Sequence, residues 1–130
     1  MRPTTWLAPL VIAAALLTGC STGSDAVTDV DVAEAQQIVD EGTAVILDVR
    51  TPEEFAAGHL PGAININVES SDFETQVTSL DESAETLVYC RTDNRSGVAT
   101  DQMAELGFTD VSDLQGGIEA WAAAGEPVVR

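Results

Sequence analysis

Segments with helical and strand-like hydrophobic spacing alternate along most of the chain. From Asp31, which can cap a helix, apolar residues recur at helical spacing as far as Gly42, which can end it. The stretch Ala44 to Val49 is almost continuously apolar, as expected of a parallel strand buried on both faces. Pro52 favours the first turn of a short helix that follows.

The second half of the chain continues this alternation. The pattern predicts strands at 63–66, 86–89 and 109–112, and helices at 71–80, 95–107 and 117–124. Such alternation indicates an α/β domain with a mostly parallel sheet and helices on both faces. Sites in these sheets form at the carboxyl ends of strands. Cys90 has that position, because it follows the strand at 86–89 and precedes a helix.

The N-terminus has the pattern of an export signal. Arg2 precedes the apolar run Trp6 to Leu17, which is too short to span a membrane. The following stretch LTGC, Leu17 to Cys20, resembles the bacterial lipobox, in which the Cys receives a diacylglyceryl group and becomes the new N-terminus. The alternative is an ordinary signal peptide, with Cys20 incidental.

The lipobox reading divides the chain into a signal peptide at 1–19, a lipid-anchored tether at 20–26 and a folded domain at 27–130. We then expect export and anchoring to the outside of the bacterial cytoplasmic membrane, or to the outer membrane. Cys90 is left as the one free thiol, which is unusual in an exported protein. The alternative is that Cys90 is a small buried core residue.

The charge of the chain is strongly negative. It has 130 residues, with 22 acidic side chains, five Arg and no Lys, and a net charge of −17. A field of this sign argues against a nucleic-acid partner. Two of the five arginines, Arg91 and Arg95, nevertheless lie beside Cys90 in the stretch YCRTDNRSG.

These surroundings favour a nucleophilic thiolate at Cys90. A helix N-terminus leaves backbone N–H groups unpaired, a tight loop can turn more of them inward, and the two arginines add full charges. The unpaired N–H groups and the two arginines favour the thiolate form of Cys90 over the thiol, and they would also bind an anionic substrate. His59, the only His, is interpreted as a turn residue in GHLPGA. One thiol and one His do not make a metal site.

Two long motifs resemble the rhodanese family. They are LDVRTPEEFAAGHLPGAINI and YCRTDNRSGVA with the later LGF and LQGGIEAW. The resemblance extends from about Val27 to Trp121 and implies the three-layer rhodanese fold. It also implies a sulfurtransferase, in which a loop Cys takes sulfur from a donor such as thiosulfate and passes it to a thiophilic acceptor.

Carried onto this sequence, the resemblance makes Cys90 the nucleophile and persulfide carrier. Arg91 and Arg95 would bind the sulfonate oxygens of a small anionic donor. Loop backbone amides would stabilise the sulfur anion, and they belong to Thr92, Asp93, Asn94, Arg95 and Ser96. The family implies no cofactor and no metal. We expect membrane association only through the N-terminal lipid, and a monomer.

The loop departs from the family pattern at one position. Asp93 stands where many members have Gly, which predicts a positive φ that Asp tolerates. Its carboxylate is expected to oppose ionisation of the thiol and to repel an anionic donor. The loop from Cys90 to Arg95 has the shorter length of sulfur-transferring members, which disfavours a phosphatase or an arsenate reductase.

The remaining motif residues are interpreted as structural. Asp48 and Arg50 end the other central strand, and Arg50 is expected to pair with Glu54 or Glu53. Three aromatic residues are expected in the core: Phe55, Phe108 and Trp121. Two alternatives stay open: a non-enzymatic sulfur-carrier or partner-binding domain, and a redox-sensing thiol.

Overall fold

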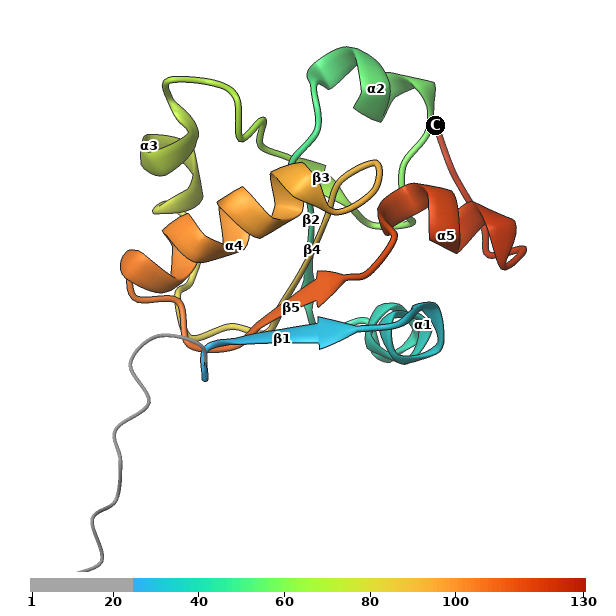
Figure 1. Cartoon of the computed structure of the whole chain (residues 1–130), viewed down its shortest axis with the longest axis horizontal. Helices are drawn as coiled ribbons and strands as arrows, with labels where there is room; N and C mark the ends of the chain where they lie inside the picture. Colours follow the sequence, from blue (N-terminus) through green and yellow to red (C-terminus); the bar gives the residue numbers. More distant parts are fainter. Residues whose placement is uncertain (1–24) are drawn as a thin grey trace, which may run out of the picture.

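The computed structural model describes residues 25–130, which form a five-stranded, all-parallel sheet with the order β1-β5-β4-β2-β3 (Figure 1). The strands are β1 Val27–Val30, β2 Val45–Asp48, β3 Ile64–Asn65, β4 Thr86–Tyr89 and β5 Val111–Leu114. The helices are α1 Val32–Glu41, α2 Pro52–Ala57, α3 Phe73–Val77, α4 Asn94–Glu105 and α5 Gly117–Ala123. The predicted signal peptide and the predicted lipid-attachment residue Cys20 lie outside the described residues.

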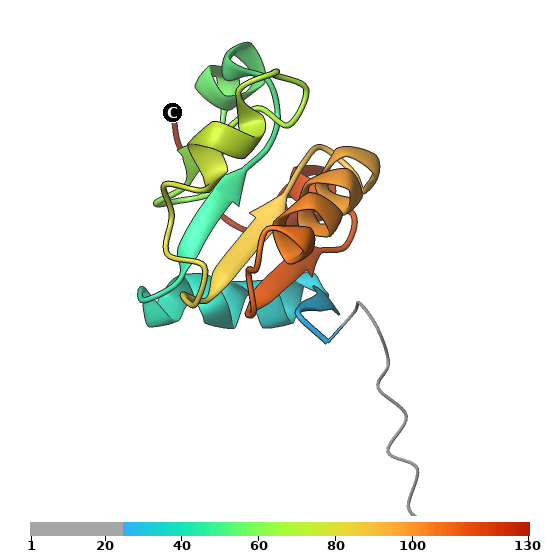
Figure 2. The ribbon, with the colours of Figure 1, turned by 90° about the vertical axis from the view of Figure 1, so that its left-hand side faces the viewer.

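Helices cover both faces of the sheet. One apolar cluster joins the sheet to α3 and α4 through residues such as Val77 and Met103. A second cluster joins the opposite face to α1 and α5 through residues such as Ala35 and Trp121. Figure 1 shows these helix pairs on opposite sides, and Figure 2 shows β2, β4 and β5 side by side. The predicted three-layer α/β fold is confirmed.

Local sequence signals account for most element boundaries. Asp31 caps α1 in a capping box with Glu34, and Gly42 ends it in a left-handed conformation with φ 70°. Strand β4 has the predicted bounds. Pro52 opens α2 as predicted, with Thr51 as its N-cap.

Two strands differ from the sequence expectation. Strand β1 was not predicted, because VTDV has apolar residues only at its two ends and neither alternates nor forms an apolar run. Strand β5 begins two residues later than predicted and carries Ser112 and Asp113, which are polar but buried. Because half of its residues are polar, the sequence pattern did not give the correct bounds of this internal strand of the sheet.

The end of the chain is attached beside α2. His59 and Val129 form an antiparallel bridge with hydrogen bonds of 2.9 Å in both directions, and Arg130 Nε donates to Ala57 O at 3.0 Å. The His59 ring stacks on Phe55 with centroids 3.8 Å apart. His59 is therefore a structural turn residue, as predicted. Phe55 is only half-buried, so its predicted core position is wrong, whereas Phe108 and Trp121 are buried.

Candidate active site

Cys90 lies at the carboxyl end of β4, at the centre of the sheet, where a short loop leads into α4. Its neighbours in the sheet are β2 and β5, so side chains from three strands converge at this edge. Cys90 is 1% exposed, and its Sγ donates to Ser96 Oγ across 3.5 Å. The thiol thus belongs to the core cluster and also faces the first turn of α4.

The N-terminus of α5 fixes the start of the loop. Ile118 N donates to Cys90 O at 2.9 Å, and Glu119 N donates to Arg91 O at 3.2 Å. Gly117 makes this approach possible: a Cβ there would lie 2.4 Å from Cys90 O, and its φ is +57°. The carbonyl groups at the start of the loop are therefore held by α5.

The amide groups of the loop are left without partners. Within residues 25–130, none of the backbone N–H groups from Thr92 to Ser96 donates a hydrogen bond to a protein acceptor. The first intrahelical bond runs from Gly97 N to Asp93 O at 3.0 Å. Free amides at a helix N-terminus beside a thiol form a site suited to an anion.

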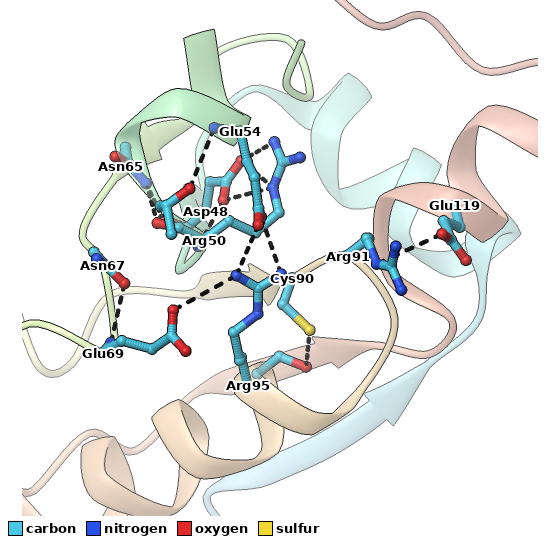
Figure 3. A network of polar contacts seen from close by, with 12 residues as sticks. Asp48, Arg50, Glu54, Asn65, Asn67, Glu69, Cys90, Arg91, Arg95 and Glu119 are labelled. Carbon is cyan, nitrogen blue, oxygen red and sulfur yellow. Dashed lines mark hydrogen bonds and ion pairs between the residues drawn. The ribbon is translucent and has the colours of Figure 1, made fainter. Parts of the chain in front are cut away.

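Both loop arginines are engaged by carboxylates (Figure 3). Arg95 binds both oxygens of Glu54, at 3.2 and 3.0 Å, and lies 3.9 Å from Glu69. Hydrogen bonding to Glu54 raises the pKa of Arg95 above its ordinary value. Arg91 points away from Cys90 toward Glu119 at 3.6 Å, with its side chain 65% exposed. An anionic donor must compete with these carboxylates for either guanidinium group.

Arg50 does not pair with Glu54 or Glu53, so that expectation is wrong. Its guanidinium group binds Asp48 at 2.6 Å and Gly58 O at 2.7 Å. The side chain folds back along its own strand, while Glu54 points across to Arg95. Burial acts to lower the pKa of Arg50, but the hydrogen bond and charge of Asp48 raise it above its ordinary value. The buried Asp48–Arg50 pair therefore joins the end of β2 to the turn at Gly58.

Asp93 also differs from expectation. Its φ is −139°, so the position does not need the left-handed conformation that the family Gly suggested. The carboxylate accepts a hydrogen bond from Gly116 N at 2.7 Å. Asp93 therefore ties the Cys90 loop to the turn that opens α5. Its effect on thiol ionisation and donor binding stays a prediction.

Sequence reasoning missed one buried acid near the site, Asp113 on β5. It is 6% exposed, and its Oδ1 has no hydrogen-bond partner. Burial raises its pKa to about 6, and the charges of nearby acidic groups act in the same direction. The available signal was an acidic residue between the apolar Val111 and Leu114.

Comparison with known proteins identifies the family. The family model described as rhodanese-like domain matches residues 31–124. The chain belongs to the rhodanese-like domain family. Thiosulfate sulfurtransferase 16 of Arabidopsis thaliana is 43% identical over 62% of this chain and 76% of its own length. A sulfurtransferase of Allochromatium vinosum is 30% identical over 73% of this chain and 87% of its own length.

Solved rhodanese-like structures have the same architecture. The crystal structure of a rhodanese-related protein from Thermoplasma volcanium superposes with a TM-score of 0.69 at 30% identity. The match covers 78% of this chain and 96% of that one. An Anabaena protein, Alr3790, matches 77% of this chain with a TM-score of 0.71. In this rhodanese-like chain, the predicted loop residues follow Cys90 directly and open α4; Ser96 contacts the thiol, and the Arg91 side chain is turned outward.

A shallow groove lies beside this loop, between α2 and α5. It has a volume of about 290 Å³ and is open to solvent. Its lining includes Glu54 and Glu119, the partners of the two loop arginines, and apolar residues such as Ile118 and Val128. Cys90 does not line it, so the groove borders the candidate site without containing the thiol.

Proposed function

We propose that this chain is a sulfurtransferase that moves sulfane sulfur from a thiosulfate-like donor to a thiophilic acceptor through Cys90. The observation that carries the proposal is the set of unpaired amides from Thr92 to Ser96 around the thiol. Relatives named as thiosulfate sulfurtransferases support it. Cys90 is also the one free cysteine among residues 25–130.

The reaction has two displacement steps. The Cys90 thiolate attacks the outer sulfur of the donor, the sulfur–sulfur bond of the donor breaks, and sulfite leaves with the electron pair. A persulfide remains on Cys90. A nucleophilic acceptor such as cyanide then attacks the outer sulfur, and the thiolate leaves and is regenerated. The unpaired amides stabilise the negative charge on sulfur in both steps.

The loop arginines have unequal roles in this proposal. Arg95 lies within the partly buried network around the loop and binds the donor oxygens after partial release from Glu54. Arg91 is largely exposed and reaches the donor only by turning from Glu119. Bidentate contacts of guanidinium groups with the oxygen atoms of the donor would replace those ion pairs.

Mass spectrometry of the full chain after thiosulfate treatment tests the proposal. The expected result is a gain of one sulfur atom on Cys90, which cyanide removes. The matched control is Cys90→Ser, which should gain nothing. If several sulfane donors leave Cys90 unmodified, the chain is not a sulfurtransferase.

A second candidate is a sulfur-carrier domain that receives its sulfur from a partner protein. The three carboxylates that engage Arg91 and Arg95 favour it, because they weaken the attraction of a free anion. A carrier would be loaded by a protein persulfide but not by thiosulfate. Parallel loading with both donors separates the two candidates.

We further propose that the chain is exported and anchored to the membrane by a lipid on Cys20. The support is the sequence alone: a short apolar run followed by LTGC. Among residues 25–130, no helix is long and apolar enough to cross a membrane. Metabolic labelling with a fatty acid should mark the wild type and not Cys20→Ala. Equal labelling of both would refute the anchor.

A further inference from the structure

The loop that carries Cys90 is attached to the start of α5 at three points. Two of them are backbone hydrogen bonds from the first turn of α5 to the carbonyl groups of Cys90 and Arg91, at 2.9 and 3.2 Å. The third comes from a side chain, since Gly116 N donates to Oδ1 of Asp93 at 2.7 Å. The two backbone bonds hold the beginning of the loop, and the carboxylate of Asp93 holds its end.

The N–H group of Gly116 needs an acceptor outside its own helix. Gly116 is the N-cap of α5, so its carbonyl accepts the first bond of the helix, from Ala120 N at 3.1 Å, while its N–H lies outside the helical ladder. The 2.7 Å distance to Asp93 is that of a hydrogen bond assisted by charge. One oxygen of the Asp93 carboxylate is therefore engaged by an amide of the neighbouring turn.

The backbone carbonyl of Asp93 holds the first turn of α4. It accepts from Gly97 N at 3.0 Å and from the Ser96 hydroxyl at 3.0 Å. The buried Oγ of Ser96 in turn lies 3.5 Å from the sulfur of Cys90. Asp93 therefore connects the turn before α5, through its side chain, to the group that contacts the thiol, through its main chain.

The backbone conformation of Asp93 does not require Asp or Gly. Its φ of −139° and ψ of −29° are free of the left-handed strain that favours Gly. A Gly at this position would keep the backbone bonds but would remove the acceptor of the Gly116 N–H. It would also add conformational freedom at the point where the loop enters α4. What distinguishes Asp from the Gly of the family pattern is thus the bond made by its side chain.

We propose that Asp93 is a positioning residue, whose side-chain oxygen holds the amides of residues 92–96 in the arrangement that binds the anionic donor and the sulfur anion. The inference rests on the proposed sulfur transfer and deepens it. It also changes the expectation from the family pattern, in which the carboxylate only hinders an anionic donor. The oxygen of Asp93 favours the reaction by holding the loop, and its charge alone opposes it.

Three substitutions of Asp93 separate the oxygen from the charge. Asp93→Asn keeps an acceptor oxygen without the charge, Asp93→Ala removes both, and Asp93→Gly supplies the family residue. In steady-state kinetics with thiosulfate, kcat should fall about tenfold in the Ala and Gly variants, the effect of losing one hydrogen bond to a charged group. Asp93→Asn should retain kcat within about twofold and lower KM about two- to threefold, because an exposed repulsive charge is gone.

Amide hydrogen exchange, followed by NMR in the full chain, tests the positioning without a sulfur donor. In Asp93→Ala the amides of Gly116 and Gly97 should both exchange severalfold faster than in the wild type, whereas in Asp93→Asn they should stay protected. Gly116 reports the side-chain bond, and Gly97 reports whether that bond fixes the Asp93 carbonyl. The exposed Asp40→Asn is the matched control for loss of one acidic charge and should change neither the exchange nor the kinetics.

Three results would overturn the inference. The first is sulfur transfer in Asp93→Gly or Asp93→Ala as fast as in the wild type, which would leave the carboxylate only a hindrance. The second is a kcat in Asp93→Asn as low as in Asp93→Ala. The third is faster exchange at Gly116 with unchanged exchange at Gly97, which would mean that the side-chain bond does not reach α4. A wild type that takes up no sulfur would refute the proposed sulfur transfer, and the exchange rates would still decide whether Asp93 positions the loop.

Discussion

At the scale of single residues, several acidic side chains lie near the one thiol of the candidate site. The thiol of Cys90 is enclosed with the carboxylate of Asp113 near by and Asp93 in its own loop. The loop cations are partly neutralised by Glu54 and Glu119. In the proposed sulfur transfer, the sulfur anion would be stabilised chiefly by the backbone amides, which carry no net charge and which no carboxylate in the described residues engages.

Asp113 should make folding stability depend on pH. The folded protein holds the proton of Asp113 up to about pH 6, whereas the unfolded chain releases it near pH 4. The folded state thus binds more protons between these values, so stability falls as pH rises through this range. Asp113→Asn should be about 2–3 kcal/mol more stable than the wild type at pH 7.5, and the difference should vanish below about pH 4.

Urea unfolding at pH 4 and pH 7.5 measures this difference. The control Asp40→Asn, at an exposed position on α1, should stay within about 0.5 kcal/mol of the wild type at both pH values. A variant at Asp113 that is equally destabilised at both pH values would show that the carboxylate has a hydrogen-bonding role in the folded state that outweighs its burial.

Glu54 should limit the affinity for an anionic donor. Glu54→Gln removes the charge that competes for Arg95 and should lower the KM for thiosulfate about two- to fivefold, the strength of a partly exposed ion pair. The matched variant Glu119→Gln should have less effect, because its pair with Arg91 is longer and more exposed. Steady-state kinetics measure both. A higher KM in Glu54→Gln would instead mean that Glu54 orients Arg95 for binding.

At the scale of elements, the site is built where three loops meet at the carboxyl edge of the sheet. The β4–α4 loop supplies the thiol and amides, α2 supplies Glu54, and the first turn of α5 holds the loop by its carbonyl groups. The Asp93 carboxylate and Gly117 make the closest of these contacts. The geometry around Cys90 therefore depends on α5 as much as on its own loop.

Gly117 should be essential for this contact. Gly117→Ala forces a side chain into a left-handed conformation and places Cβ 2.4 Å from Cys90 O. The conformation alone costs about 1–2 kcal/mol, and the clash displaces the loop as well. Gly125→Ala is the matched control, since its φ is +82° and nothing lies within 4 Å. Both variants should lose stability in urea unfolding, but only Gly117→Ala should lose sulfur-transfer activity. If the two variants had equal sulfur-transfer activities, the contact between α5 and the Cys90 loop would not be needed for the reaction.

Elements with strong local signals could be predicted from sequence, and contacts across the sheet could not. The caps of α1 and the apolar strand β4 depend on neighbouring residues, so their bounds followed from local patterns. The Cys90 loop was found because its residues are contiguous. The partner of Arg95 is 41 positions away, and only the fold brings it near. Arg50 was expected to pair with Glu54 or Glu53, whereas its partner in the fold is Asp48, only two positions away.

At the scale of the whole molecule, the negative field opposes the proposed reaction with an anion. The chain carries a net charge of −17, and the charged side chains around the loop are mostly acidic. Enzymes of anionic substrates usually surround the site with positive potential, which raises the rate of encounter. Here the field has the opposite sign and repels the anion, and only the loop amides and the two arginines attract the donor at close range.

Salt should therefore accelerate the reaction with thiosulfate. The screening length falls from about 30 Å at 0.01 M salt to about 8 Å at 0.15 M, which weakens repulsion by distant acidic groups. We expect kcat/KM for thiosulfate to rise severalfold over this range, opposite to the behaviour of a steered enzyme. Alkylation of Cys90 by neutral iodoacetamide is the control, because the field does not repel it, and its rate should change much less. A kcat/KM that falls with salt would mean that Arg91 and Arg95 dominate the approach of the donor despite the ion pairs that engage them.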